Sequence, residues 1–343
     1  MSDFPTSLPT PTTPDPMSAP PVRWGILGPG RIARSFASAV RAHTRGTITA
    51  VGSRSPERAA AFAAEHGGRP TDYDGVLAAD DVDVVYVATP HSEHAALAVR
   101  ALDAGKPVLV EKAFTGTVVE AAAVIETANH SGLTCMEAMW TRFLPHMDVA
   151  RTLVRDGVLG DVETLIADHG QWFAEDRESR LYAPELAGGA ILDLGVYPLA
   201  FAFDMLGTPG DVAARGTSAF TGVDRQVSMI LTGFDGAPQA HALLSTTLAA
   251  RTPTTASVSG SLARLEIGTR FYGPSTLRLV HRDGRTLEGR PDAVEGGLAY
   301  EAAHMAQLVT DGEPQSPLMP LAETLAIMTL MDGVRSRVMG LVD

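Results

Sequence analysis

The sequence predicts an α/β protein with two domains: a doubly wound parallel sheet, then an α+β domain with a large, open-faced, mostly antiparallel sheet. Up to about residue 142, short strands that are apolar on both faces alternate with helices, which is typical of a parallel sheet covered on two sides. Beyond that point the strands are longer and alternate between apolar and polar residues, which favours antiparallel pairing. A chain of 343 residues has room for two such domains.

The composition excludes several classes of protein. With 27 Lys and Arg against 40 Asp and Glu, the net charge is −13, which disfavours unspecific binding to nucleic acid. The single cysteine, Cys135, excludes a disulfide framework and fits a reducing cytoplasm. No apolar run approaches the about 18–20 residues of a membrane helix, and the first residues lack a secretory signal. We expect a cytoplasmic protein with neither nucleic acid nor membrane as a partner.

Three segments are predicted along the chain. Residues 1–21 are rich in Pro, Ser and Thr and are predicted to be a disordered tail. Residues 22–142 form the parallel-sheet domain, and residues 143–343 form the second domain. We expect the chemistry to lie in a cleft between the two domains.

Apolar runs and helix signals give the elements of the first domain. In the second helix, Ser55 is a plausible N-cap, Pro56 suits the first helical position, and Gly67 is a plausible end. The predicted strands are residues 22–27, 47–52, 82–89, 107–112 and 133–139, and the helices are residues 31–42, 56–66, 92–105 and 118–130.

The second domain combines alternating strands with longer helices. Segments such as LLSTTL and ARLEIG would leave an exposed apolar sheet face in a monomer, so we expect a homodimer or a higher homo-oligomer. The predicted strands are residues 161–171, 225–234, 238–248, 255–260, 263–268 and 276–281, and the helices are residues 145–156, 189–206, 298–309 and 321–338.

A glycine motif follows the first strand and opens the first helix. Gly28, Gly30 and Ala33 form G-x-G-x-x-A: the first permits a tight turn, the second lets a pyrophosphate approach, and the third allows close helix–strand packing. The alternative is a tight turn without a ligand. We expect a dinucleotide here, held by Gly28, Gly30, Arg31 and Ile32.

The end of the second strand favours NADP over NAD. An NAD site usually has an acidic residue there to bind the ribose 2′-hydroxyl, but this chain has Ser53 and Arg54, and no acidic residue before Glu57. Guanidinium groups suit a 2′-phosphate, so Ser53, Arg54 and Arg58 are candidate ligands for it. Solvated surface charges remain the alternative for both arginines.

Lys112 ends the strand that contains PVLVEK, where parallel sheets place their ligands. Glu111 beside it is a candidate partner. A surface lysine in a loop explains the residues equally well. His91 and His94 have the spacing of two metal ligands, but no third ligand is apparent, so we expect no metal site.

Six segments together resemble the Gfo/Idh/MocA family of oxidoreductases. They are GPGRIA, TPHSEHA, AGKPVLVEKAF, MEAMWTRFLP, GGAILDLGVYPLAFAFDML and SPLMPLAETLAIMTLMD. The resemblance runs from Val22 nearly to the C-terminus. MEAMWTRF and the tyrosine of DLGVYP resemble the branch that contains dimeric dihydrodiol dehydrogenase and NADP-dependent D-xylose 1-dehydrogenase. The family implies a Rossmann domain followed by an open-faced α/β domain.

The resemblance also implies functional residues. Lys112 matches the catalytic lysine, Tyr197 matches the second catalytic position, and Asp193 matches the aspartate of the same motif. Ala113 departs from the proline that most members have after the lysine. Residues expected at the cofactor are Thr89, Pro90, His94, Glu111, Lys112, Trp140 and Arg142, and those expected at the substrate are Lys112, Trp140, Trp172, Asp193 and Tyr197.

These residues suggest alcohol oxidation on a sugar, inositol or cyclic diol. A free tyrosine has a pKa of about 10, and a neighbouring ammonium would lower it enough for Tyr197 to accept a proton. Lys112 would support it, although the two roles could be exchanged. Two alternatives are a carbonyl or anhydro-sugar reductase that works in the opposite direction, and a non-catalytic dinucleotide sensor, which would be expected to lose Lys112 or Tyr197.

Overall fold

The computed structural model describes residues 4–340. They fall into two compact units. The parallel-sheet unit comprises residues 14–143 and 294–328, and the antiparallel-sheet unit comprises residues 4–13, 144–293 and 329–340. The chain passes from the parallel-sheet unit to the antiparallel-sheet unit after Phe143.

Residues 294–328 lie in the parallel-sheet unit, whereas the sequence placed them in the second domain. Long-range hydrogen bonds explain this return of the chain. The backbone N–H of Cys135 donates to the carbonyl of Pro314 at 3.0 Å, and the hydroxyl of Thr134 donates to the carbonyl of Glu313 at 2.8 Å. The segment therefore joins the edge strand of the parallel sheet.

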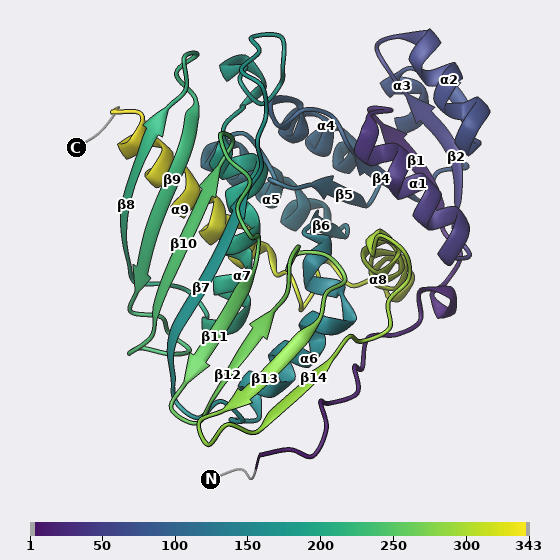
Figure 1. The fold of residues 1–343 in the computed structure, drawn as a ribbon. Helices are drawn as coiled ribbons and strands as arrows, with labels where there is room; N and C mark the ends of the chain where they lie inside the picture. The colour runs from purple at the N-terminus through teal and green to yellow at the C-terminus, as the bar shows by residue number, and fades with distance from the viewer. Residues whose placement is uncertain (1–3, 341–343) are drawn as a thin grey trace. The chain divides into compact units, whose positions relative to one another are not determined.

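The parallel-sheet unit contains a six-stranded sheet in the order β3-β2-β1-β4-β5-β6 (Figure 1). Every pair of neighbouring strands is parallel. The strands are β1 (Arg23–Leu27), β2 (Thr47–Gly52), β3 (Arg69–Thr71), β4 (Val84–Val87), β5 (Val108–Glu111) and β6 (Cys135–Ala138). This confirms the doubly wound parallel sheet; β3 is an additional edge strand that the sequence analysis missed.

Some helices of this unit begin at side-chain caps that the sequence contains. The Ser55 hydroxyl accepts a hydrogen bond from the N–H of Arg58, and Thr117 forms a capping box with Glu120. The helices are α1 (Arg31–His43), α2 (Pro56–His66), α3 (Tyr73–Leu77), α4 (His91–Asp103), α5 (Val118–Ser131) and α8 (Leu298–Asp311), with 3-10 turns η1 (Pro16–Ser18) and η2 (Trp140–Phe143). The sequence analysis missed α3.

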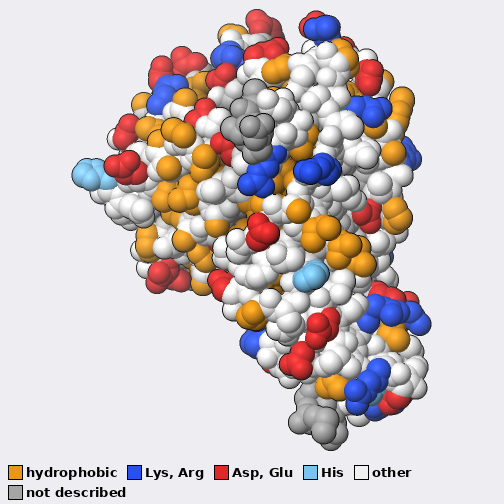
Figure 2. Space-filling view, turned by 90° about the vertical axis from the view of Figure 1, so that its left-hand side faces the viewer, with side chains coloured by type: hydrophobic (Ala, Val, Ile, Leu, Met, Phe, Trp, Pro, Cys, Tyr) orange, Lys and Arg blue, Asp and Glu red, His pale blue; other side chains and the backbone are white. Residues whose placement is uncertain are grey.

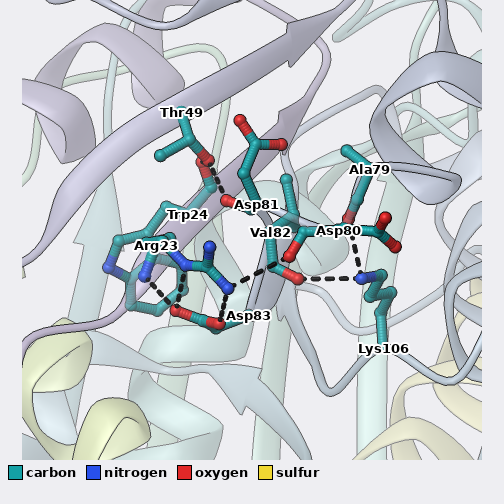
Figure 3. Close-up of polar contacts among 9 residues, drawn as sticks. All are labelled: Arg23, Trp24, Thr49, Ala79, Asp80, Asp81, Val82, Asp83 and Lys106. Carbon is teal, nitrogen blue, oxygen red and sulfur yellow. Dashed lines mark hydrogen bonds and ion pairs between the residues drawn. The ribbon is translucent and has the colours of Figure 1, made fainter.

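The amino ends of the parallel strands are fastened by a polar network (Figure 3). Arg23, which opens β1, binds both carboxylate oxygens of Asp83, which precedes β4. The ammonium of Lys106 donates to the carbonyls of Ala79 and Val82 at 2.8 and 2.9 Å. These contacts tie together the amino ends of the strands. The network leaves the carboxyl ends, where parallel sheets bind their ligands, available for a ligand.

The antiparallel-sheet unit contains an eight-stranded sheet in the order β14-β13-β12-β11-β7-β10-β9-β8 (Figure 1). All its neighbouring pairs are antiparallel except β7 with β10. The strands are β7 (Val162–Gly170), β8 (Asp211–Ser218), β9 (Asp224–Thr232), β10 (His241–Thr247), β11 (Ala256–Gly260), β12 (Ala263–Ile267), β13 (Leu277–His281) and β14 (Thr286–Gly289). The mostly antiparallel sheet is confirmed; β8 and β14 were not predicted.

The predicted helix over residues 189–206 consists of two parts. A π-helical turn, Ile191–Gly195, leads directly into α7, Val196–Leu206, and every residue of the turn is buried. Among the described residues, the helical stretch Pro184–Leu206 is apolar and long enough to cross a membrane, but 89% of its apolar window is buried. It is a core helix. The unit also contains α6 (Pro145–Arg155), and α9 (Leu321–Val338) joins it from Thr329 onward.

One face of the antiparallel sheet exposes a row of large apolar side chains. Leu243 on β10 pairs in register with Ile166 on β7 and with Ile230 on β9. These three side chains are 42%, 51% and 48% exposed, respectively. Figure 2 shows hydrophobic side chains gathered on the face of the molecule that it presents. Such a row is costly in contact with water.

Residues 4–21, which the sequence analysis placed in a disordered tail, make specific contacts. The Phe4 ring lies 5.0 Å from that of His281, and the Thr12 hydroxyl donates to the Asp148 carboxylate at 3.0 Å. Further along, Arg45 donates to the carbonyl of Ala19 at 2.9 Å. Because this segment is rich in proline, it loses less conformational entropy on docking than an ordinary chain would.

Candidate functional site

The turn between β1 and α1 has the form of a phosphate cradle. Gly28 adopts φ +93°, and a Cβ there would lie 2.7 Å from the side chain of Thr89, so the turn requires glycine. Gly30 is the N-cap of α1 and supplies no side-chain cap. The first N–H groups of the helix, including those of Arg31 and Ile32, are therefore suited to an anionic ligand.

The end of β2 presents two exposed guanidinium groups. Gly52 accepts a hydrogen bond from the N–H of Gly28, which places Ser53 next to the glycine turn. Arg54 is 72% exposed at its side chain and lies 3.8 Å from the carboxylate of Glu93. Arg58, in the first turn of α2, is also exposed. No acidic side chain occupies the strand end itself, where NAD enzymes usually have one.

His94 connects the loops that follow β4 and β5. Its ring nitrogens lie 2.8 Å from the carbonyl oxygen of Thr89 and 3.0 Å from that of Ala113. The side chain is fully buried, and burial lowers the pKa of His94 while the carbonyl contacts act in the opposite direction. His94 therefore holds together the two loops that carry Thr89, Pro90 and Lys112. Because it is enclosed, it has no exposed surface for a ligand.

The carboxyl end of β5 carries the predicted lysine. Lys112 is partly exposed, and its backbone N–H donates to the Glu111 carboxylate at 3.1 Å. The other oxygen of that carboxylate accepts a hydrogen bond from the hydroxyl of Tyr86 on β4. The peptide bond between Lys112 and Ala113 is cis. Glu111 thus fixes the strand end from which the lysine projects.

A second buried carboxyl group faces this strand end. Glu301 on α8 is fully buried, and neither of its oxygens has a hydrogen-bond partner. Burial and the neighbouring negative charge of Glu111 raise the pKa of Glu301 well above its usual range. Burial and the nearby Glu111 carboxylate both favour the protonated form of Glu301. Nothing in the local sequence indicated this pairing.

The predicted cleft residues Trp140 and Arg142 lie in the turn η2, after β6. Both are buried, with 8% and 3% of their surface exposed. The Arg142 guanidinium binds the Glu323 carboxylate and donates to the carbonyl of Leu318 at 3.0 Å. Arg142 therefore fastens the returning segment 294–328 to the edge of the parallel sheet. The local sequence gave no sign of this role.

The antiparallel-sheet unit contributes a cluster of three aromatic rings. Tyr197, at the start of α7, is 7% exposed. Its ring centroid lies 5.3 Å from that of His169 and 4.7 Å from that of Tyr272. His169 also stacks on Tyr272, at 4.5 Å. The sequence analysis missed Tyr272, because it lies in a loop with no motif around it.

The other predicted residues of this unit differ in exposure. Asp193 is 7% exposed and accepts a hydrogen bond from Arg180 at 2.9 Å. Trp172, after β7, is 61% exposed. The structure therefore brings Asp193 and Tyr197 together on consecutive turns of one helical segment. It leaves Trp172 on the surface of the unit.

No metal centre stands out. Among residues 4–340, no group of three or more His, Cys, Asp or Glu side chains could hold a metal ion. Cys135 is buried, and burial raises the pKa of its thiol to about 12, which makes it unreactive.

Comparisons with known proteins identify the relatives of this chain. Residues 22–139 match the profile GFO_IDH_MocA, which describes an oxidoreductase family with an NAD-binding Rossmann fold. Residues 147–266 match the profile of the GFO/IDH/MocA C-terminal domain. The trans-1,2-dihydrobenzene-1,2-diol dehydrogenase of Bos taurus is 31% identical over 330 residues, covering 92% of this chain and 97% of the relative. The D-xylose 1-dehydrogenase (NADP⁺) of Hypocrea jecorina is 33% identical, covering 91% and 90%.

Solved structures agree with these relationships. A 3-ketoreductase from Actinomadura kijaniata, in complex with NADP and TDP-benzene, matches with a TM-score of 0.81 and 28% identity, over 92% of this chain and 98% of the other. The aldose-aldose oxidoreductase of Caulobacter crescentus matches with a TM-score of 0.84 and 25% identity, over 94% and 98%. The glycine turn, the lysine at the end of β5, both profiles and these full-length matches lead to one conclusion: the chain belongs to the Gfo/Idh/MocA family of oxidoreductases.

Proposed function

We propose that this protein is an NADP-dependent dehydrogenase that transfers a hydride between the nicotinamide and a hydroxyl of a sugar, an inositol or a cyclic diol. The observation that carries the proposal is the carboxyl edge of the parallel sheet. There the glycine turn follows β1 and the arginines follow its neighbour β2, while Lys112 follows β5, which β4 separates from β1. Relatives named as diol and xylose dehydrogenases support the substrate class.

The residues of this edge fit NADP. The α1 N-terminus, with glycine as its cap, suits the pyrophosphate, and Ser53, Arg54 and Arg58 suit the 2′-phosphate. When bound, the nicotinamide supplies the hydride acceptor or donor. The NADP named in the xylose dehydrogenase and in the 3-ketoreductase structure supports this cofactor over NAD.

In this proposal Lys112 and Tyr197 handle the proton of the substrate hydroxyl. The phenol of Tyr197 accepts the proton, and the ammonium of Lys112 stabilises the phenolate and donates a hydrogen bond to the substrate oxygen. Asp193 and Trp172 contribute to the substrate pocket, as does Trp140. Tyr197 sits in an aromatic cluster that restricts its ring, which supports a fixed position for its hydroxyl.

The opposite direction is a second candidate function. The structural relative named as a 3-ketoreductase favours it, because reduction of a carbonyl uses the same groups with the proton and the hydride reversed. The test is to incubate the purified protein with NADP⁺ and aldoses, inositols, anhydro-sugars or cyclic diols, and with NADPH and the corresponding carbonyl compounds. Turnover in neither direction would contradict the proposed function.

We also propose that the protein is a cytoplasmic homodimer whose subunits meet through the exposed apolar row Ile166, Leu243 and Ile230. A twofold axis would let each row cover its counterpart. The free, buried Cys135 agrees with a reducing compartment. Analytical ultracentrifugation at micromolar concentration should give twice the chain mass of 36.1 kDa, and a monomer alone would contradict the dimer.

A further inference from the structure

The turn Ile191–Gly195 carries Asp193 and leads directly into the helix of Tyr197. Three neighbouring strands of the antiparallel sheet, β7, β10 and β9, each contribute a side chain that contacts the backbone of this turn or the residue before it. The contacts are His169 Nδ1 with Leu194 O at 3.2 Å, Thr246 Oγ1 with Ala190 O at 3.3 Å, and Asp224 Oδ2 with Ile191 N at 2.7 Å.

Asp224 makes the shortest of these contacts and is fully enclosed. It opens β9 and is 0% exposed. The residue two positions before Ile191 is Gly189, with φ +126°, and a Cβ there would lie only 2.2 Å from Asp224 Oδ1. Arg335 Nε lies 3.7 Å from the same oxygen. The carboxylate thus occupies the space that a side chain at residue 189 would fill.

A carboxylate in this position is expensive, since burial removes it from water. Burial raises the pKa of Asp224 to about 6, against the opposing effects of the Ile191 N–H and Arg335. An apolar residue would fill the same space without that cost. An apolar residue could not, however, accept a hydrogen bond from the N–H of Ile191, the first residue of the turn.

We propose that Asp224 is a positioning residue for Tyr197. By holding the backbone at Ile191, with Gly189 leaving it room, the carboxylate sets where the π-helical turn begins and hence where Asp193 and the Tyr197 hydroxyl point. This inference rests on the proposed function, in which Tyr197 accepts the substrate proton. It gives β9 a role in the reaction although β9 itself carries no reacting group.

The test compares two aspartates that make the same type of contact at opposite ends of the same helical segment. Asp235 accepts a hydrogen bond from the N–H of Thr208 at 2.8 Å. Thr208 follows Gly207, the residue at the C-terminal end of α7. We expect Asp224→Ala to lower kcat by about tenfold or more, because small displacements of reacting groups are costly, with the KM for NADP⁺ unchanged. Asp235→Ala should leave kcat as in the wild type. An equal loss of kcat in both variants would overturn the proposal.

Two further variants distinguish positioning from a general structural role. In a Tyr197→Phe background, Asp224→Ala should have almost no further effect on kcat, because the two act as one unit. A full tenfold additional loss would contradict the inference. Asp224→Asn keeps an oxygen acceptor for Ile191 and should restore most of the kcat lost in Asp224→Ala. If the alanine variant does not fold, this asparagine variant carries the test, and a loss of kcat as large as that of Tyr197→Phe would then count against the acceptor role.

Amide hydrogen exchange gives a readout that does not depend on turnover. The amides of residues 191–197 should exchange faster in Asp224→Ala than in the wild type, while those of α6 stay the same. Unchanged exchange at 191–197 would overturn the inference even if the wild-type protein were active. An inactive wild-type protein with faster exchange in the variant would instead contradict the proposed function alone.

Discussion

The rings of Tyr197 and Tyr272 stack with their centroids 4.7 Å apart and an angle of 30° between their planes. Tyr197 opens α7, whereas Tyr272 lies in the loop between β12 and β13. Offset stacking of this kind contributes roughly 0.5–1.5 kcal/mol beyond the area that it buries. The loop therefore restrains the orientation of the proposed proton acceptor.

The stack leads to a prediction for Tyr272. Tyr272→Phe keeps the ring and should keep kcat within about twofold, whereas Tyr272→Ala removes it and should lower kcat more than it raises the KM for NADP⁺. Steady-state kinetics on a substrate found in the screen measures both constants. If Tyr272→Phe is as impaired as Tyr272→Ala, the hydroxyl rather than the stacking matters, and the restraint described here is the wrong explanation.

Lys112 and Tyr197 should behave as one unit. Lys112→Met removes the charge and Tyr197→Phe removes the proton acceptor, and each should lower kcat by about 100-fold or more, the scale of lost general acid–base catalysis. The double variant should be little worse than the poorer single variant. Fluorescence titration should show that NADP⁺ still binds to all three. Near wild-type kcat in Tyr197→Phe would make Tyr197 a packing residue.

Arg54 should decide between the two nicotinamide cofactors. Its exposed guanidinium would make a charge-assisted contact with the 2′-phosphate, which contributes roughly 1.5–3 kcal/mol. Arg54→Ala should therefore lower kcat/KM with NADP⁺ by about 10–150-fold and leave the value with NAD⁺ nearly unchanged. Arg45 lies in the same unit and donates a hydrogen bond to the carbonyl of Ala19, so Arg45→Ala provides a charge-matched control. Equal losses with both cofactors would exclude the 2′-phosphate role of Arg54.

Glu137 on β6 should make stability depend on pH. It is 1% exposed, and burial raises its pKa from 4.5 to about 7, while the Thr324 hydroxyl donates to it at 3.0 Å. Because the folded state holds this proton more tightly than the unfolded state, stability falls as the pH rises from about 4.5 to about 7 and changes little above that through this group. Glu137→Gln should therefore melt at a higher temperature than the wild type at pH 8. The difference in melting temperature should be much smaller at pH 5. A difference in melting temperature that does not vary with pH would show that Glu137 is ionised throughout.

The exposed apolar row provides a test of self-association. Leu243→Glu places a charge between Ile166 and Ile230, and a twofold interface would bring two such charges together without solvent. We expect this variant to sediment as a monomer. Asp211→Ala, at the exposed start of β8, should leave the association state as in the wild type. A Leu243→Glu variant that associates as the wild type does would place the interface elsewhere.

The sequence by itself determined the features that depend on neighbouring residues. Strands apolar on both faces can only lie between two layers of helices, and the Ser55 and Thr117 caps act within three residues of themselves. The glycine turn is of the same kind, because positive φ and close approach to Thr89 leave no room for a side chain at residue 28. For these features, the conformation that the local sequence favours is the one that the tertiary structure contains.

Only the tertiary structure decided the contacts between distant parts of the chain. Arg142, which the sequence analysis predicted at the cofactor, is buried against Glu323, 181 residues away in sequence, where it fastens a returning segment. Asp224 lies 33 residues beyond Ile191. Along the sequence, strands β8 to β12 lie between Tyr197 and Tyr272, although the two rings stack. No periodicity or motif encodes such pairs. They arise where elements remote in sequence become neighbours in the fold. At Asp224, for example, the start of β9 meets a buried turn whose N–H needs a hydrogen-bond partner.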